Sequence, residues 1–381
     1  MARIGIDVTA AVTQGGGIGR YTRELVAAVV AAEGEMEFRL FTAKPPAILP
    51  VPNPLPKGKR ITLCEAPVAD KWLYRLWYRL RVPWSVQRFT GDLDLFHSPD
   101  FVLPPVAGGI PTLLTVHDLS FAHYPETFTP ALRRYLERTV PWSVGRATHV
   151  LADSEATKED LQSIWGVDEG KITVLYSGVH ERFEPANNNK QIQSVRRRYE
   201  LGDAPYLLSV STIQPRKNYQ RLIRSFKRVA AHYPHQLVIG GGKGWLYEDI
   251  LAEVARQGLE GRVKFIGFVA DDDLPALYSG AQLFLFPSLY EGFGLPLLEA
   301  MACGVPVVTS EASSLPEVAG EAAVQLPPTD EEAWTEAMMA LLGDGVARSK
   351  LVAQGFRQVK MFSWQSSARQ LLAVYRRLLE R

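Results

Sequence analysis

The chain has 381 residues, 46% of them apolar and 22% charged, which is typical of globular proteins rather than of disordered or membrane-embedded ones. Lysine and arginine number 42 against 41 aspartates and glutamates, and this balance argues against nucleic acid as the main partner, because binding to phosphate backbones needs a basic excess. Cys64 and Cys303 form neither a metal-binding pattern nor a disulfide framework, and the N-terminus lacks the apolar run of a signal peptide. We therefore expect a cytoplasmic protein long enough for two domains.

Short apolar runs alternate with segments of helical period along the whole chain. The runs cover residues 3–9, 37–43, 61–66, 93–98, 112–117, 149–154 and 172–176, and then 206–211, 236–240, 263–268, 283–287, 305–309 and 322–326. Such runs, rich in Val, Ile, Leu and Phe, are typical of parallel strands that are buried on both faces. Their alternation with helical segments predicts an α/β protein with doubly wound sheets.

A polar, Asn-rich stretch at residues 184–190 (EPANNNK) interrupts this alternation and is predicted to be a surface linker. It separates two Rossmann-like domains of similar size, with residues 1–185 on one side and the second domain beginning at 190. Ligands of open α/β sheets bind outside the carboxyl ends of the strands, so we expect the site in a cleft where the two domains face one another.

The loop after the predicted strand at 283–287 has the features of an anion site. Gly292 and Gly294 allow the backbone to approach a ligand closely. A helix is predicted to start near Leu295, and Pro296 suits its first turn, where a missing N–H is no loss. The N–H groups at such a helix start are suited to a diphosphate.

Two glutamates flank this helix start. Helical side chains lean toward the N-terminus, so Glu299 is expected to point back toward the same pocket, where its carboxylate can accept hydrogen bonds from ribose hydroxyls. Glu291 lies in the loop and can reach hydroxyls of a sugar. A lone glutamate in a loop is usually a solvated charge, but the glycine loop and the strand–loop–helix context favour a binding role for this pair.

Three further segments place polar side chains after predicted strands. Arg216 and Lys217 open a helix after the strand at 206–211, and two cations there can neutralise a diphosphate leaving group. A glycine-rich turn at 15–19 follows the first strand, although it is not the GxGxxG of a dinucleotide site. His117, followed by Asp118, ends the strand at 112–117 and can bind sugar hydroxyls or be structural.

Three other segments have competing interpretations. The acidic run 271–273 resembles a metal cluster, but helix capping explains it better, so no metal is expected. Residues 153–157 have helix-start chemistry and are interpreted as structural. In the segment 71–88, arginines alternate with aromatic residues. Its apolar residues follow the helical spacing of a core, whereas its arginines can dock on anionic lipid headgroups.

The spacing of Glu291 and Glu299 within EGFGLPLLEA resembles the signature of retaining GT-B glycosyltransferases of family four. The resemblance extends over essentially the whole chain and is firmer in the second half. It implies that Glu291 contacts the donor sugar and that Glu299 binds the ribose. It also implies that the diphosphate is held by the backbone of Gly292, Phe293, Gly294 and Leu295.

The same resemblance assigns roles to residues outside this motif. Lys217 and Arg216 become the leaving-group cations, although many members have the arginine four residues earlier, where this chain has Thr212. The resemblance further implies that the nucleobase lies against the backbone of Phe268 and Val269. It implies that Gly16 and Gly17 approach the donor phosphates and the acceptor, and that His117 contacts the transferred sugar. The last helix of such enzymes crosses back to the first domain, which implies domains of 1–185 plus 364–381 and of 190–363, with a hinge near 177–181 and 361–364.

The resemblance implies a metal-independent hexosyltransferase with no cofactor, whose co-substrate is a nucleotide-diphosphate sugar. The motifs GGGIGRY, TVHDL and PRKN are similar to those of bacterial mannosyltransferases of polysaccharide biosynthesis, which favours GDP-mannose as donor and a glycan or lipid-linked acceptor. Peripheral association with the inner face of the membrane fits such an acceptor. A UDP-glucose- or UDP-N-acetylglucosamine-dependent transferase, a GT-B sugar-nucleotide epimerase and a non-catalytic binding module stay open.

Overall fold

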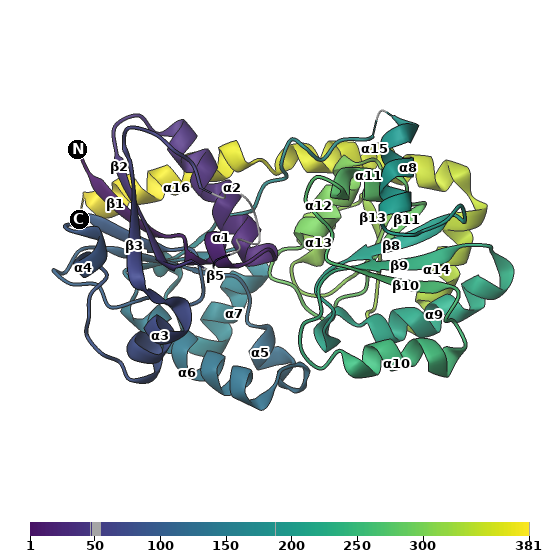
Figure 1. The fold of residues 1–381 in the computed structure, drawn as a ribbon, viewed down its shortest axis with the longest axis horizontal. Coiled ribbons are helices and arrows are strands. Elements are labelled where there is room, and N and C mark those ends of the chain that lie inside the picture. Colours follow the sequence, from purple (N-terminus) through teal and green to yellow (C-terminus); the bar gives the residue numbers. More distant parts are fainter. Residues whose placement is uncertain (46, 48–54, 187, 381) are drawn as a thin grey trace. The chain divides into compact units, whose positions relative to one another are not determined.

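The computed structural model describes residues 1–45, 47, 55–186 and 188–380, so Asn187 of the predicted linker and Arg381 lie outside the described residues. The chain divides into two compact units (Figure 1). The first unit consists of Met1–Leu119, Arg134–Gly178 and the residues from Trp364 onward. The second consists of Ser120–Arg133 and Val179–Ser363.

Within its described residues, the first unit contains a sheet of seven parallel strands in the order β3-β2-β1-β4-β5-β6-β7. The strands are β1 (Arg3–Asp7), β2 (Glu37–Lys44), β3 (Ile61–Ala69), β4 (Leu95–Ser98), β5 (Thr112–Val116), β6 (His149–Ala152) and β7 (Ile172–Val174). The strand order reverses between β1 and β4, which is where doubly wound sheets bind ligands.

Helices cover this first sheet. They are α1 (Thr9–Thr13), α2 (Gly17–Ala32), α3 (Asp70–Tyr74), the π-helical turn η1 (Arg75–Arg79), α4 (Gln87–Thr90), α6 (Pro130–Arg146), α7 (Glu155–Trp165) and α16 (Trp364–Leu379). The C-terminal helix α16 packs against α2 (Figure 1). The hydroxyl of its Tyr375 lies 2.8 Å from Nδ1 of the buried His97 on β4. The end of the chain is therefore part of the first unit's core.

The second unit contains, in the residues that are described, a sheet of six parallel strands in the order β10-β9-β8-β11-β12-β13. The strands are β8 (Tyr206–Val210), β9 (Gln236–Gly240), β10 (Val263–Gly267), β11 (Leu283–Phe286), β12 (Val307–Ser310) and β13 (Ala323–Leu326). The helices are α8 (Asn189–Arg198), α9 (Tyr219–His232), α10 (Glu248–Gln257), α11 (Leu274–Ser279), α12 (Leu295–Ala302), α13 (Leu315–Ala319), α14 (Glu331–Gly343) and α15 (Gly345–Gln358). This is the strand order of a dinucleotide-binding sheet, and its reversal falls between β8 and β11.

Every apolar run predicted to be a strand is a strand, with ends that differ by at most a few residues. The reason is burial on both faces: all residues of β4, β5, β6, β11 and β12 are buried, because helices pack on each side of the sheets. The predicted α/β class with two doubly wound sheets is confirmed.

The chain changes unit at Leu119–Ser120 and Arg133–Arg134, on either side of a short segment, and again at Gly178–Val179 and Ser363–Trp364. The N–H of Val179 donates to the carbonyl of Phe362 at 3.3 Å, so the segments at the last two of these changes are hydrogen-bonded to each other. No described helix is both long enough and apolar enough to span a lipid bilayer.

The residues just after Gly178 belong to the second unit for a packing reason. Phe183 packs edge-on against Tyr278 of α11, with ring centroids 6.1 Å apart, and Arg182 lies 3.7 Å from a carboxylate oxygen of Asp271. The change of unit therefore falls at Gly178–Val179. The composition of the linker places this boundary a few residues later, at residue 185.

The short helix α5 (Ser120–His123) and the turn η2 (Pro125–Thr127) follow β5 in sequence but group with the second unit. The indole N–H of Trp245 donates to the carbonyl of Thr127 at 2.7 Å, and Phe128 packs on the same indole. A side-chain anchor of this kind has no periodic signal in the sequence.

The segment 71–88 follows the predicted core pattern only in part. Leu73 and Trp77 are buried, but Trp72 is 49% exposed and Leu80 is 67% exposed. The buried Leu73 and Trp77 are four residues apart, so one helical face packs on the core, whereas Trp72 and Leu80 lie outside that face.

Candidate functional site

The strongest candidate site lies where the strand order of the second sheet reverses. β8 and β11 are neighbours there, and the loops that follow them carry two of the motifs singled out in the sequence. Residues 211–218 follow β8 and residues 287–294 follow β11, so the sheet brings Lys217 and Glu291 together from positions far apart in the chain.

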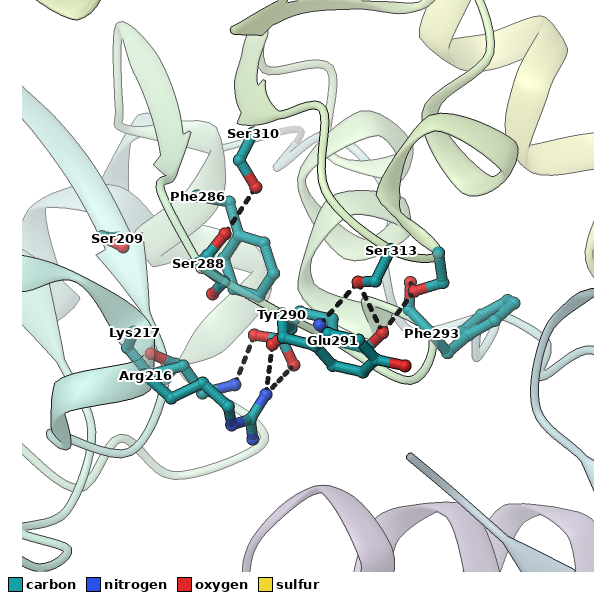
Figure 2. A network of polar contacts seen from close by, with 12 residues as sticks. Ser209, Arg216, Lys217, Phe286, Ser288, Tyr290, Glu291, Phe293, Ser310 and Ser313 are labelled. Atoms are coloured by element: carbon teal, nitrogen blue, oxygen red, sulfur yellow. Dashed lines mark hydrogen bonds and ion pairs between the residues drawn. The ribbon is translucent and has the colours of Figure 1, made fainter. Parts of the chain in front are cut away.

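The side chains of Lys217 and Arg216 converge on the carboxylate of Glu291 (Figure 2). Nζ of Lys217 donates to Oε1 at 2.5 Å, and the guanidinium of Arg216 donates to Oε2 at 3.1 Å. Arg216 also donates to the carbonyl of Tyr290, and the ammonium of Lys217 lies 5.7 Å from the ring centroid of Phe286. Two cations and one carboxylate are thus held together, leaving a local charge of +1.

All three charged side chains are close to fully buried, with at most 11% of each side chain exposed. Burial by itself raises the pKa of the Glu291 carboxyl, but the charges of Lys217 and Arg216 outweigh it and lower that pKa to about 2. The carboxylate is therefore ionised at neutral pH, and it faces the two cations across short hydrogen bonds.

Two serines of the turn between β12 and α13 fix the backbone of Glu291. The hydroxyl of Ser313 accepts from the Glu291 N–H at 2.8 Å and donates to the Glu291 carbonyl at 2.8 Å (Figure 2). The hydroxyl of Ser314 donates to the carbonyls of Glu291 and Phe293, each at 3.0 Å. Ser313 has φ of +50°, a conformation that non-glycine residues rarely adopt, and the paired hydrogen bonds help to hold it there.

The helix α12 begins directly after this clamped loop. Its N-cap residue is Gly294, at φ of +110°, with no side-chain cap, and a Cβ at that position would lie 2.8 Å from a side-chain carbon of Leu315. Leu295 and Pro296 open the helix without a side-chain cap, so the predicted helix start is present, and the Leu297 N–H donates to the Gly294 carbonyl at 2.9 Å. Gly292 and Phe293 are buried within the loop.

Glu299 lies on α12 and is 2% exposed. The hydroxyl of Tyr278, from α11, donates to its Oε2 at 2.9 Å. Tyr278 is itself fully buried and packs edge-on against Phe284 of β11. The carboxylate predicted to bind ribose is therefore held by a neighbour that sequence spacing did not reveal.

Asn218 ties the loop after β8 to the loop after β11. It has φ of +60°, and its side-chain amide donates to the carbonyls of Pro287 and Pro328 at 3.0 and 2.6 Å. Left-handed backbone suits asparagine better than most residues, so the residue type and the two hydrogen bonds favour the same conformation.

Phe268 and Val269, predicted to lie beside a nucleobase, follow β10 on the far side of β9. The ring of Phe268 is 55% exposed, whereas Val269 is buried close to Gly240 at the end of β9. An exposed aromatic ring beside a buried aliphatic side chain suits the stacking of a base.

The acidic run near these residues has a different role from the capping that its sequence suggested. Asp273 is the N-cap residue of α11 but makes no cap hydrogen bond. Its carboxylate accepts from Arg198 at 2.5 and 2.7 Å and from the hydroxyl of Tyr199 at 2.9 Å. Among the described residues, no group of three or more His, Cys, Asp or Glu is arranged to hold a metal ion.

In the first unit, His117 pairs with Asp153 rather than with its sequence neighbour Asp118. Nδ1 lies 2.7 Å from a carboxylate oxygen of Asp153, and Nε2 lies 3.3 Å from the carbonyl of Pro99. β5 and β6 are adjacent, so their carboxyl ends bring these two side chains together. The interpretation of residue 153 as purely structural missed this pair, which the adjacency of the two strands would have revealed.

Burial opposes charge on both members of the pair: it favours a lower pKa for His117 and raises the pKa of Asp153. The carboxylate nevertheless dominates at the imidazole and raises the pKa of His117 to about 9. Both ring nitrogens face acceptors, which the doubly protonated imidazolium satisfies. His117 is therefore the cation of a buried ion pair at neutral pH.

Gly16 and Gly17 open α2 at the point where the order of the first sheet reverses. Both are exposed, and a Cβ at either would meet nothing within 4 Å, so the protein itself does not require glycine there. By contrast, a Cβ at Gly19 would lie 2.2 Å from the carbonyl oxygen of Gln14. Tyr21 of the same helix packs edge-on against His117 at 4.9 Å, which links the helix start to the histidine.

Comparison with known proteins gives these features a family context. Residues 15–183 match the model described as Glycosyltransferase Family 4, and residues 191–358 match Glycosyl transferases group 1. The O-antigen chain mannosyltransferase B of Escherichia coli is 31% identical over 375 residues, which cover 95% of this chain and 96% of that protein. This chain belongs to glycosyltransferase family 4. The predicted family resemblance is thereby confirmed.

Two further relatives place this family 4 glycosyltransferase among known sequences and folds. The O-antigen chain mannosyltransferase RfbU of Salmonella typhimurium is 29% identical, over 73% of this chain and 72% of that protein. The sucrose-phosphate synthase of Thermosynechococcus elongatus superimposes with a TM-score of 0.77 over the whole of both chains at 23% identity. The fold of the glycosyltransferase is accordingly GT-B, as predicted.

Proposed function

We propose that this glycosyltransferase transfers mannose from GDP-mannose to a growing bacterial surface glycan, with retention of the anomeric configuration. The observation that carries the proposal is the cluster of Lys217, Arg216 and Glu291 at the strand-order reversal, beside the uncapped start of α12. The choice of mannose is supported by the two relatives that are named as O-antigen mannosyltransferases.

In the proposed reaction, the bond between the sugar C1 and the diphosphate oxygen breaks, and GDP leaves. The acceptor hydroxyl forms a new bond to C1 on the same face, and its proton passes to the leaving phosphate oxygen. Negative charge grows on the diphosphate as this bond breaks, so Lys217, Arg216 and the N–H groups at the start of α12 stabilise the transition state. These groups supply the neutralisation that a metal ion provides elsewhere, so we propose that transfer is metal-independent.

The two glutamates have separate roles in this proposal. A carboxylate has about four acceptor positions, so Glu291 can keep its ion pairs and still accept hydrogen bonds from sugar hydroxyls. By the same reasoning, Glu299 can accept from ribose hydroxyls while Tyr278 donates to it. The exposed ring of Phe268 supplies a stacking face for the base.

The first unit contributes the acceptor side. The exposed backbone of Gly16 and Gly17 leaves room for a ligand at the start of α2, and His117 contributes a fixed positive charge near the end of β5. We propose a lipid-linked glycan as acceptor, with transfer on the cytoplasmic face of the membrane.

The donor is tested by incubating the purified protein with GDP-mannose, UDP-glucose or UDP-N-acetylglucosamine and with lipid-linked glycan acceptors, each with and without EDTA. We expect transfer from GDP-mannose alone, unchanged by EDTA. The one-bond C1–H1 NMR coupling of the transferred mannose should be that of the same anomer as in the donor. Turnover only with a UDP-sugar overturns the choice of mannose, an inverted product overturns retention, and loss of turnover in EDTA overturns metal independence.

The site is tested with Lys217→Ala and a matched control, Arg228→Ala. Both changes remove one cation from an ion pair in the second unit, but Arg228 and its partner Glu332 are exposed. We expect Lys217→Ala to lower kcat by about 100-fold or more, as for other groups that stabilise developing charge, and Arg228→Ala to match the wild type. Equal turnover in the two variants overturns the assignment of Lys217.

A further inference from the structure

The segment 71–88 is anchored to the first unit on one side only. The buried side chains of Leu73 and Trp77 hold it, and the Trp77 ring packs 5.7 Å from that of Phe41 on β2. The indole N–H of Trp77 also donates to the carbonyl of Trp84 at 2.8 Å, which fixes the position of Trp84 in the chain that follows η1. The exposed side chains of residues 71–88, here called the tryptophan–arginine surface, are therefore carried on an ordered base.

Large apolar side chains stand in solvent on this surface. Trp72 is 49% exposed, Leu80 is 67% exposed and Trp84 is 44% exposed, and Leu63 on the adjoining edge strand β3 is 54% exposed. α3 and α4 both pack beside β3, so the segment that carries these side chains runs along one edge of the sheet (Figure 1). Scattered exposed apolar residues need no explanation, but several on one edge mark an interaction surface.

Within residues 71–88 the charges have one sign, although the exposed Asp70 directly precedes them. Residues 71–88 contain five basic side chains, Lys71, Arg75, Arg79, Arg81 and Arg88, and no acidic one, although the chain as a whole has a net charge of only +1. The guanidinium of Arg75 lies 4.7 Å from the ring of Trp72, and that of Arg88 lies 5.5 Å from the ring of Trp84. Each exposed tryptophan is thus accompanied by a cation.

Arg81 extends the surface onto α6. Its guanidinium lies 4.8 Å from the ring of Trp142, which Arg146 approaches at 3.7 Å. α6 adds exposed arginines at positions 134 and 138, with the exposed Glu137 between them. The basic character is therefore shared by two neighbouring segments of the first unit.

We propose that the tryptophan–arginine surface docks the protein on a bilayer that contains anionic phospholipids. Tryptophan rings favour the headgroup level of a membrane, and arginines beside them meet lipid phosphates, so the two side-chain types match the two layers of such an interface. A purely acidic protein partner would satisfy the cations but not three exposed apolar side chains. The inference deepens the proposed use of a lipid-linked acceptor and rests on it for its purpose, but binding itself requires neither donor nor acceptor.

The test is sedimentation of the full chain with vesicles of phosphatidylcholine alone or with 30% phosphatidylglycerol (about a third anionic lipid, a composition chosen to give a clear surface charge). Each basic side chain near an anionic surface contributes about 1 kcal/mol, so Arg75→Gln with Arg79→Gln should weaken binding to the anionic vesicles about 30-fold. The control, Arg228→Gln with Arg256→Gln, removes the same charge from arginines that are paired with carboxylates in the second unit and should leave binding unchanged. Trp72→Ser with Trp84→Ser should weaken binding while leaving the thermal midpoint within a few degrees of the wild type.

Equal binding to both vesicle types overturns the role of the arginines, and sedimentation with neither overturns membrane docking. If light scattering shows that the wild type is a dimer and that Trp72→Ser with Trp84→Ser is a monomer, the surface binds a second copy of the chain instead. If the wild type binds a single-stranded oligonucleotide and Arg75→Gln with Arg79→Gln does not, the surface binds nucleic acid instead. Donor hydrolysis measured without vesicles is the independent readout of the proposed function: if it fails while vesicle binding holds, the membrane inference stands and the donor proposal falls.

Discussion

Replacing Glu291 by glutamine removes the carboxylate on which two buried cations converge. The structure places Lys217 and Arg216 within 2.5 and 3.1 Å of its oxygens, and at most 11% of each of the three side chains is exposed. The pKa of Glu291 falls from 4.5 to about 2, which corresponds to roughly 3 kcal/mol of stabilisation of the charged form. Removing one partner of a buried ion pair costs about 3–5 kcal/mol in other proteins, so the two magnitudes agree.

Glu291→Gln should therefore lower the thermal midpoint of the second unit by about 6–12 °C, the shift that about 3 kcal/mol produces in a unit of this size. Its anion site should become stronger, because the two cations no longer share their charge with a carboxylate. We expect tighter binding of GDP and of pyrophosphate in calorimetric titrations, together with a large loss of turnover, because the sugar contact is gone.

The pH dependence gives a second check on this reasoning. The folded pKa is depressed, so the stabilisation is complete above about pH 4.5 and is lost as the pH falls toward 2. The difference in unfolding free energy between wild type and Glu291→Gln should accordingly shrink over that range. The matched control is Glu332→Gln, whose exposed ion pair with Arg228 should contribute less than about 1 kcal/mol. A Glu291→Gln protein as stable as this control, or one that binds pyrophosphate more weakly than the wild type, would refute the argument.

Three further substitutions test the surroundings of the site. Tyr278→Phe removes the hydroxyl that holds Glu299 and should weaken the binding of GDP about 10-fold, because a hydrogen bond to a charged group contributes about 1.5–3 kcal/mol. The affinity for pyrophosphate, measured in the same titrations, should not change. An equal loss of affinity for both ligands contradicts the ribose role of Glu299. The pKa of His117 is raised to about 9, so its ion pair with Asp153 stabilises the fold fully below about pH 6.5 and progressively less as the pH rises through 9. In Asp153→Asn, the free energy of urea unfolding should therefore depend less on pH between these values. An unchanged pH dependence contradicts the ion pair. Gly294→Ala places a Cβ at 2.8 Å from a leucine of α13 in a left-handed conformation and should cost about 1–3 kcal/mol in urea unfolding, a cost that wild-type stability would exclude.

The strands were predictable from the sequence because each is a run of apolar residues buried on both faces, a pattern that needs no tertiary information. The helix start after Gly294 was predictable for a similar local reason, since glycine and Pro296 signal it directly. In contrast, the helical spacing within residues 71–88 predicted a wide core face, but Leu73 and Trp77 are buried while Trp72 and Leu80 are exposed. Spacing shows which residues share a helical face, but not how much of that face the rest of the protein covers.

The pairings within the site were beyond local reasoning. Sequence patterns placed Lys217 near the diphosphate and Glu291 near the sugar, but their contact depends on β8 lying next to β11, which is a property of the sheet order. The partner of His117 depends in the same way on β5 lying next to β6. Asp273 was assigned to a helix cap because capping is the commonest local use of aspartate, whereas Arg198 reaches it from another helix.

Asn218 has a practical consequence for protein engineering. Its amide joins the loop after β8 to the carbonyls of Pro287 and Pro328, so segments from three places in the chain are fastened by one side chain. The EGFGLPLLEA motif should therefore not be grafted alone into another protein. Without Asn218, the loop that carries the motif loses a hydrogen bond to the loop that carries Lys217. Chimeras between relatives should instead exchange Val179–Ser363 together with Ser120–Arg133, so that the second unit moves whole.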